Sequence, residues 1–154
     1  MFFIPRIASF TGRLHLNGSV ERVFPLFSPI GEKQWVPGWD PEILHPSGSF
    51  WEEGLIFRTS EESGTAIWIV SNLDISAHRV RYHRVEPTHY VARIDVTCDV
   101  VSIGVTDVST VYKFVGLSEE GNNAINLMTE EEYAAKMVRW TTWLERCLAS
   151  GVGC

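Results

Sequence analysis

Apolar and polar residues alternate along several short stretches of this chain. Between Arg6 and Leu16, even positions such as Phe10 and Leu14 are apolar, whereas odd positions such as Arg13 and His15 are polar. A period of two is typical of a β-strand that buries one face. The sequence therefore predicts a first strand over residues 6–16.

Two short helices are predicted after this strand. Ser19 is a suitable N-cap for a helix over residues 20–27, which Pro25 keeps short. Ser28 followed by proline predicts a second helix that ends near Trp35. The next segment, 36–54, is rich in proline and glycine and is expected to be irregular.

The middle of the chain is predicted to be a strand meander. Its five strands are separated by short turns that contain residues such as Gly64, Pro87 and Gly104. Strands this close in sequence must be antiparallel neighbours, because parallel pairing needs a long crossover. The predicted strands are 55–60, 65–73, 79–85, 90–101 and 105–115.

Near the end of the chain, the spacing between apolar residues changes from two positions to three or four. The change marks one face of a long helix, which Thr129 begins and Gly151 ends. A shorter helical segment is expected over 118–128. The apolar stripe of the long helix is Tyr133, Met137, Trp140, Leu144, Cys147 and Leu148.

This order of elements predicts an α+β fold. A curved antiparallel sheet of about six or seven strands wraps round the long C-terminal helix, and two short helices follow the first strand. A chain of 154 residues suits a single domain, 1–154. A sheet that closes incompletely round one helix is expected to leave a cavity between them.

The chain resembles the START-like (SRPBCC) superfamily, which has the helix-grip fold. The resemblance covers roughly residues 6–149 and is carried by the Val23–Phe27 helix, the Trp35–Pro41 stretch, the Trp68–Val70 strand and the terminal helix to Leu144. The superfamily includes birch-pollen-allergen-like proteins, polyketide cyclases/dehydrases and heat-shock ATPase activators. The resemblance implies a cavity for hydrophobic ligands, and catalysis only in a minority of members.

Successive side chains of a strand point to opposite faces of the sheet, and this alternation predicts which side chains line the cavity. An apolar wall with a few converging polar groups is the usual form of a small-molecule site. Arg84 would need a carboxylate partner or an anionic ligand there. The alternative places the tyrosine hydroxyls in water at the rim of the sheet. The predicted ligand-binding residues are Phe57, Tyr82, Arg84, Tyr90, Ile94, Thr110, Tyr112, Met137 and Trp140.

Three tryptophans near the irregular segment are open to several interpretations. Trp35, Trp39 and Trp51 could form a lid over the cavity, a dimer contact, or a simple part of the core.

Charge and cysteine content narrow the range of partners. With 13 basic and 19 acidic residues the net charge is −6, which argues against nucleic acid. No apolar run is long enough for a signal peptide or for membrane insertion. Cys98, Cys147 and Cys154 show no paired spacing, so structural thiols and a cytoplasmic location are expected.

The sequence predicts neither a metal site nor a cofactor. His78 and His83 have an odd separation on a strand, which places them on opposite faces. No metal-binding helix motif and no nucleophile elbow occurs. The outward stripe of Arg79, Arg81 and His83 could dock an acidic partner, or could pair with aspartates on neighbouring strands.

Three functions follow from this reading. The first is binding of a small hydrophobic, aromatic or lipid-like ligand between the sheet and the C-terminal helix. The second is a cyclase- or dehydratase-like enzyme that uses the same cavity, and it requires a titratable group there. The third is a protein-interaction module, or a homodimer, which requires an exposed patch instead.

Overall fold

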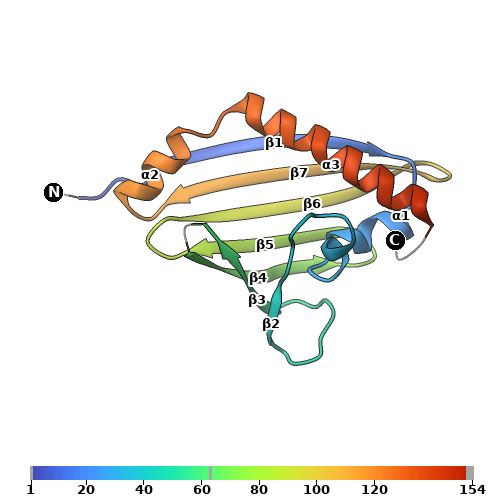
Figure 1. The fold of residues 1–154 in the computed structure, drawn as a ribbon, viewed down its shortest axis with the longest axis horizontal. Coiled ribbons are helices and arrows are strands. Elements are labelled where there is room, and N and C mark those ends of the chain that lie inside the picture. Colours follow the sequence, from blue (N-terminus) through green and yellow to red (C-terminus); the bar gives the residue numbers. More distant parts are fainter. Residues whose placement is uncertain (1, 63, 152–154) are drawn as a thin grey trace.

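A seven-stranded antiparallel sheet forms the body of the protein in a computed structural model that describes residues 2–62 and 64–151 (Figure 1). The order of the strands is β1-β7-β6-β5-β4-β3-β2, so the first strand pairs with the last. The strands are β1 (Ile7–Leu16), β2 (Glu42–His45), β3 (Ile56–Glu61), β4 (Gly64–Asp74), β5 (Arg79–Glu86), β6 (Tyr90–Ser102) and β7 (Val105–Gly116).

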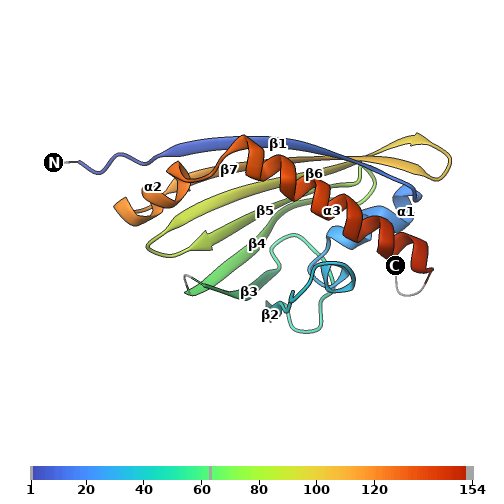
Figure 2. The same cartoon turned by 45° about the horizontal axis from the view of Figure 1, so that its top comes forward.

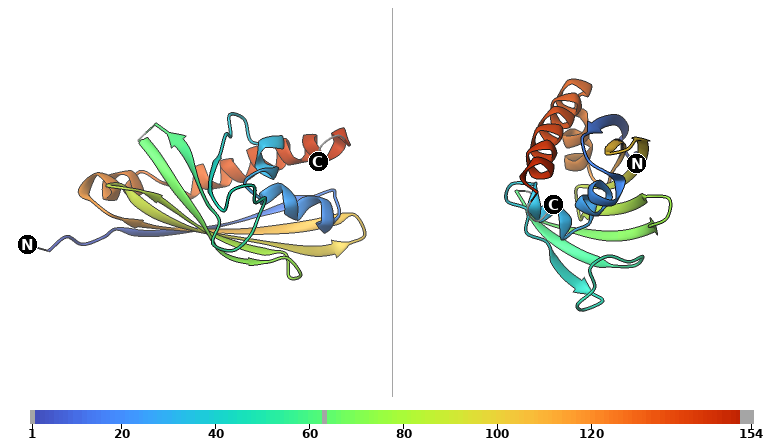
Figure 3. Two further views of the ribbon diagram at one scale, coloured as in Figure 1. Left: turned by 90° about the horizontal axis from the view of Figure 1, so that it is seen from below. Right: turned by 90° about the vertical axis from the view of Figure 1, so that its right-hand side faces the viewer.

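The helices gather on the concave face of this sheet. The long helix α3 crosses β1 and β7 diagonally, and the end-on view of Figure 3 shows the sheet curving round it (Figures 2 and 3). The helical segments are α1 (Val20–Val23), the 3₁₀ turns η1 (Phe24–Phe27) and η2 (Gly31–Gln34), α2 (Glu119–Asn126) and α3 (Glu130–Ser150).

The predicted α+β architecture is confirmed. All six predicted strands are present, and their bounds differ from the prediction by no more than one residue. The irregular segment 36–54 was predicted wrongly in one stretch, because β2 pairs there with β3 as the edge of the sheet. Its four residues are too short and too exposed to show a clear alternation.

The second helix is shorter and tighter than predicted. Ser28 Oγ accepts a hydrogen bond from the Gly31 N–H at 2.9 Å, so the capping serine is used. The segment forms only the four-residue 3₁₀ turn η2, which begins after Pro29 and ends before Pro37.

Both predicted ends of α3 are confirmed. Thr129 Oγ1 accepts a hydrogen bond from the Glu132 N–H at 3.1 Å. Gly151 ends the helix in the left-handed conformation with φ 66°. Ser19 has the extended backbone of an N-cap, but its side chain makes no capping hydrogen bond, so that part of the prediction is wrong.

We expect the Thr129→Ala substitution to lower the free energy of unfolding by about 1 kcal/mol, because the Glu132 N–H loses its acceptor. Ser19→Ala is the matched control and should change stability by less than about 0.5 kcal/mol. Urea denaturation of both variants checks this. Equal losses at the two positions would contradict the assignment of the caps.

A glycine in β1 sets how closely α3 approaches the sheet. A Cβ atom on Gly12 would lie 2.6 Å from the side chain of Met137, which is far inside van der Waals contact. The absence of a side chain at this position therefore lets α3 pack directly over β1.

The three tryptophans near the irregular segment pack against the core of their own chain; they are Trp35, Trp39 and Trp51. The indole N–H of Trp35 donates to Leu26 O at 2.7 Å, and that of Trp39 donates to Pro29 O at 2.7 Å. The indole N–H of Trp51 donates to the Tyr82 hydroxyl at 3.0 Å. These contacts support the interpretation of the three tryptophans as part of the core.

The prediction of structural thiols holds for Cys98, which is free and buried. It is wrong for Cys147, which is disulfide-bonded. Spacing along the chain did not reveal this pairing. Cys154 lies outside the described residues.

Candidate functional site

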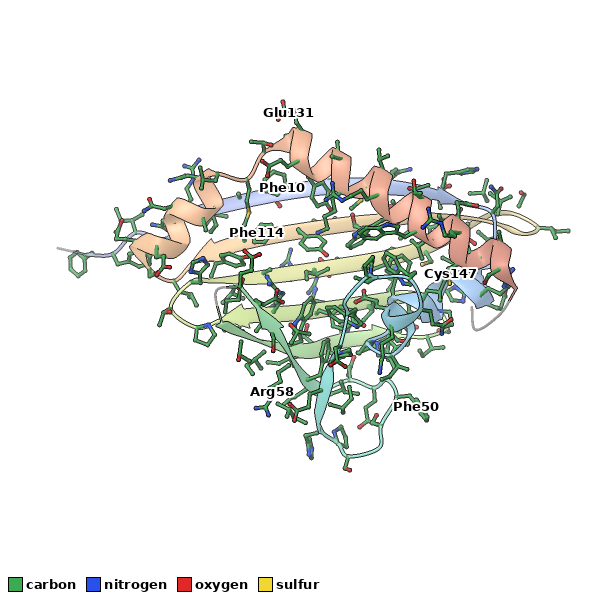
Figure 4. All side chains as sticks on the ribbon, in the orientation of Figure 1. Phe10, Phe50, Arg58, Phe114, Glu131 and Cys147 are labelled. Carbon is green, nitrogen blue, oxygen red and sulfur yellow. The ribbon has the colours of Figure 1, made fainter. Side chains whose placement is uncertain are left out.

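A recess of about 240 Å³ lies between the first half of α3 and the strands β1 and β7, and we call it the α3 recess. Figure 4 shows Phe10 and Phe114 beneath the start of this helix, whereas Glu131 points away from the sheet. The recess is lined by Phe10, Phe114, Met128, Thr129, Glu132, Tyr133, Lys136 and Arg139.

Aromatic rings form the wall of the recess. Phe10 and Phe114 come from paired strands and meet edge to face, with their centroids 6.1 Å apart. Tyr133 stacks on Phe10 from the helix, with the centroids 5.5 Å apart. Such pairs hold their geometry, because offset and edge contacts suit the ring quadrupoles. The wall is therefore apolar and preformed.

The amine of Lys136 lies among three of these aromatic side chains. Its Nζ atom is 3.8 Å from the ring centroid of Tyr112, 4.8 Å from that of Trp140 and 5.5 Å from that of Tyr133. Within the described residues, no carboxylate lies within 4.0 Å of this amine and it has no hydrogen-bond partner. The ring faces are thus the main stabilising contacts of its charge.

The surroundings of Lys136 lower its pKa to about 8. Loss of hydration in the protein interior is the main cause, and the positive charges of Arg84 and Arg139 act in the same direction. The negative charge of Glu32 opposes them. A substantial fraction of this amine is therefore unprotonated near neutral pH.

Glu32, on η2, is the acidic counterpart of this lysine. Burial raises the pKa of its carboxyl group to about 8, and the charge of Lys136 opposes the rise. Among the described side chains, none donates a hydrogen bond to this carboxyl group or lies within ion-pair distance of it. The side chain as a whole is half-buried.

Arg84 faces inward as predicted, and the protein supplies its carboxylate partners. Its guanidinium lies 3.2 Å from Glu61 Oε1 and 3.0 Å from Glu86 Oε2. It also donates a hydrogen bond to the Tyr90 hydroxyl at 3.3 Å and stacks on Trp68. The expectation of a carboxylate partner is confirmed, and no anionic ligand is needed to balance this cation.

Two other polar residues of the predicted set are used inside the protein. The Tyr82 hydroxyl donates to Phe27 O at 2.7 Å and accepts from Trp51. Thr110 shares a hydrogen bond of 2.6 Å with the Tyr133 hydroxyl. The Thr110 contact therefore positions Tyr133 in the wall of the recess, whereas the Tyr82 contacts lie outside it.

The apolar members of the predicted set divide between the core and the surroundings of Lys136. Phe57, Ile94 and Met137 are buried in the core. Tyr112 and Trp140 are half-buried beside Lys136. None of the nine predicted residues is among those that line the α3 recess.

Sequence reasoning missed Lys136 and Glu32. One signal for Lys136 was present, because residues three and four apart share a helix face and Lys136 lies midway between Tyr133 and Trp140 on the apolar stripe. No comparable signal existed for Glu32, since a short 3₁₀ turn between prolines has no periodic face. Only the packing of η2 near α3 brings its carboxyl group to the lysine.

One member of the outward basic stripe, Arg81, forms an ion pair with the neighbouring strand. Arg81 Nε lies 2.6 Å from Asp95 Oδ1 across β5 and β6, and Arg93 also approaches Asp95. His15 Nδ1 lies 2.6 Å from Asp107 Oδ1 across β1 and β7. These contacts support the interpretation as a solvated sheet face with cross-strand pairs.

This part of the chain, residues 2–62 and 64–151, contains no cluster of three or more histidine, cysteine, aspartate or glutamate side chains suited to a metal ion. It also contains no helix with the length and apolar character needed to cross a membrane.

Comparisons of sequence gave no match, either with a protein-family model or with a curated protein. Comparisons of structure gave several matches. Norcoclaurine synthase from Thalictrum flavum, solved in complex with dopamine and hydroxybenzaldehyde, superposes with a TM-score of 0.66 at 12% identity, over 92% of this chain and 88% of that chain. The chain has the helix-grip fold.

Two further helix-grip structures show the same likeness. Ginseng major latex-like protein 151 from Panax ginseng superposes with a TM-score of 0.67 at 14% identity, over 92% of this chain and 97% of that one. A hypothetical protein from Helicobacter pylori gives 0.69 at 10% identity, over 93% and 87%. These likenesses confirm the predicted resemblance at the level of the helix-grip fold.

Proposed function

We propose that this helix-grip protein binds a small hydrophobic, partly aromatic ligand in the α3 recess. The observation that carries the proposal is the composition of the recess, whose apolar aromatic wall ends at one amine without a protein partner. A pocket with few, convergent polar groups is the common form of a small-molecule site. The aromatic ligands of the norcoclaurine synthase structure show that this fold accommodates such compounds.

Different residues of the recess would supply the apolar and the polar contacts to the ligand. Burial of apolar ligand surface against Phe10, Phe114 and Tyr133 supplies the driving force, at about 25 cal/mol per Å². Lys136 lines the same recess and offers a polar contact towards which a ligand head group would orient. The ligand class is therefore an aromatic body with one polar end.

A neutral fluorescent probe tests this proposal. N-phenyl-1-naphthylamine should bind with 1:1 stoichiometry and become more fluorescent as it enters the apolar recess. We expect the Met128→Trp substitution, which adds volume to the recess lining, to weaken this binding at least tenfold. Fluorescence titration gives both affinities.

The neighbouring substitution Leu127→Trp provides the matched control. Leu127 is 76% exposed, so the same added volume should point into solvent and leave binding unchanged. Circular dichroism and thermal unfolding would establish that both variants are folded. Equal binding to the wild type and to both variants, or no binding to any of them, would contradict the proposal.

A further inference from the structure

We infer that the convex face of the sheet docks an acidic amphipathic helix of a partner protein. This face lies opposite the α3 recess, so the inference goes beyond the proposed function and does not depend on it. Three features support it: an aliphatic row in register across five strands, a basic row beside it in which like charges are opposed, and a sheet face that the described helices leave open.

The first feature is the aliphatic row. An antiparallel sheet with one solvated face is expected to alternate between apolar inward and polar outward side chains. One outward row departs from this pattern, because its members are aliphatic in five neighbouring strands. The register sets them side by side, and we call them the valine row: Ile67, Val85, Val91, Val115 and Ile7.

The valine row lies on a face that the described helices do not cover. The helices of residues 2–62 and 64–151 gather on the concave face of the sheet (Figure 3). Ile7 is 57% exposed, and the three valines are half-buried. Contiguous apolar patches of this kind on a protein surface are typical of interaction sites.

The second feature is a row of basic side chains, two residues further along the same strands. His83, Arg93 and Lys113 are paired with one another in the register of β5, β6 and β7, and we call them the basic row. Arg93 and Lys113 are directly opposed, and like charges in that position destabilise a sheet.

The protein supplies little negative charge to this row. Among the described residues, the one carboxylate within 4.0 Å of these side chains is that of Asp95, 3.6 Å from Arg93 Nε. Asp95 is already held by Arg81, whose Nε lies 2.6 Å from it. The basic row therefore keeps an excess of positive charge in a chain whose net charge is −6.

This excess charge determines the chemistry of the partner. Carboxylates placed over Arg93 and Lys113 would offset their repulsion, and aliphatic groups placed over the valine row would bury its surface. A second copy packed face to face does not supply this combination, because a two-fold axis along the strands would set one basic row on the other. A membrane surface is also disfavoured, since half-buried valines do not project as interfacial anchors do.

The spacing of the two rows fits a helix that lies along the strands. Neighbouring strands lie about 4.8 Å apart, so the three strands of the basic row span about 10 Å, which is close to the width of a helix. The two rows are about 7 Å apart along the strands, a distance that a helix covers in about four to five residues. The partner helix is therefore expected to carry aliphatic side chains on one turn and carboxylates on the next turn of the same face.

A designed peptide tests the inference. The probe is a dye-labelled helical peptide with leucines on one turn of one face, glutamates on the next turn of that face, and alanine or glutamine elsewhere. Fluorescence anisotropy should show that it binds the intact protein, with an affinity that falls as salt screens the charges. A peptide with lysines in place of the glutamates should bind at least tenfold more weakly. Equal binding of the two peptides, or binding of neither, would overturn the inference.

Two double variants locate the binding on the sheet. Arg93→Gln combined with Lys113→Gln removes the opposed charges and should weaken binding of the acidic peptide at least tenfold. Arg13→Gln combined with Arg79→Gln is the matched control, because these exposed arginines lie on the same face, four residues further along the strands. The control should bind as the wild type does, and thermal unfolding would establish that both variants are folded. Similar losses in the two variants would show a response to net charge alone and would rule out this docking surface.

Other occupants of the convex face give different results. Sedimentation should show a monomer, whereas a dimer that Arg93→Gln with Lys113→Gln dissociates would assign the face to a second copy. Binding to phosphatidylserine vesicles without binding to the acidic peptide would assign it to a membrane. The same double variant should bind N-phenyl-1-naphthylamine as the wild type does, since the α3 recess lies on the other face of the sheet. Failure of this inference is therefore distinguishable from failure of the proposed function.

Discussion

Replacing Lys136 by methionine is expected to raise the free energy of unfolding at pH 7 by about 1–3 kcal/mol. The folded state lowers the pKa of this lysine from 10.5 to about 8, so below pH 8 it holds a charge that the unfolded chain accommodates better. Methionine keeps the length of the side chain and removes that cost. The gain should vanish as the pH rises from 8 to above 10.5, where both states of the wild type are neutral.

Glu32→Gln should show the opposite dependence on pH. The folded state raises the pKa of this carboxyl group from 4.5 to about 8, so wild-type stability from this group is complete below pH 4.5 and declines as the pH rises to 8. The glutamine variant should therefore equal the wild type at pH 4 and exceed it at pH 9.

Urea denaturation at pH 4, 7 and 9 measures both effects. Lys33→Met, on the exposed neighbouring position, is the control and should change stability by less than about 0.5 kcal/mol at each pH. A loss of stability in Lys136→Met at pH 7 would mean that the amine has a stabilising partner, which would contradict the site as described.

Replacing Arg84 by methionine is expected to have the largest effect, a loss of about 3–5 kcal/mol. The guanidinium is the shared partner of Glu61 and Glu86, and its side chain is only 15% exposed. Removing one member of a buried ion pair leaves the other charge desolvated and unpaired. Two carboxylates would then face each other inside the sheet.

Arg58→Met is the matched control for this substitution. Arg58 pairs with Glu42 at 2.6 Å, but the two side chains are 48% and 59% exposed. Exposed pairs contribute about 0–1 kcal/mol, so the control should lose no more than that. Denaturant unfolding of both variants gives the comparison, and similar losses would contradict the importance of burial at Arg84.

A double substitution identifies the source of the Arg84 effect. Arg84→Met combined with Glu86→Gln removes the cation together with one carboxylate. The double variant should recover part of the stability that Arg84→Met loses, because less charge is left unpaired. Strictly additive losses would show that packing of the arginine stem, rather than the ion pairs, is responsible.

The expected gains at Lys136 and Glu32 have a functional meaning. Proteins retain destabilising groups mainly where activity or binding requires them. An amine without a carboxylate partner, in the lining of an aromatic recess, fits that pattern. Arg84 differs, because its ion pairs are complete within the protein.

The order of the predicted elements and the spacing of apolar residues along the chain were sufficient to predict the architecture. Alternation of apolar and polar residues located the strands, and it correctly placed Tyr112 and Arg84 on the inward face. The cap at Thr129 and the left-handed Gly151 marked the ends of α3. These are local features, since each depends on residues close in sequence.

The chemistry of the site depended on contacts that local patterns do not contain. Tyr82 was predicted to bind a ligand in the cavity, but its hydroxyl donates a hydrogen bond to the carbonyl of Phe27, 55 residues away. The charges of Lys136 and Glu32 act on each other although the two residues are 104 positions apart in the chain. Periodicity thus determined which way side chains point, whereas tertiary packing decided which polar groups found partners, because burial and charge at a site are set by segments far apart in the chain.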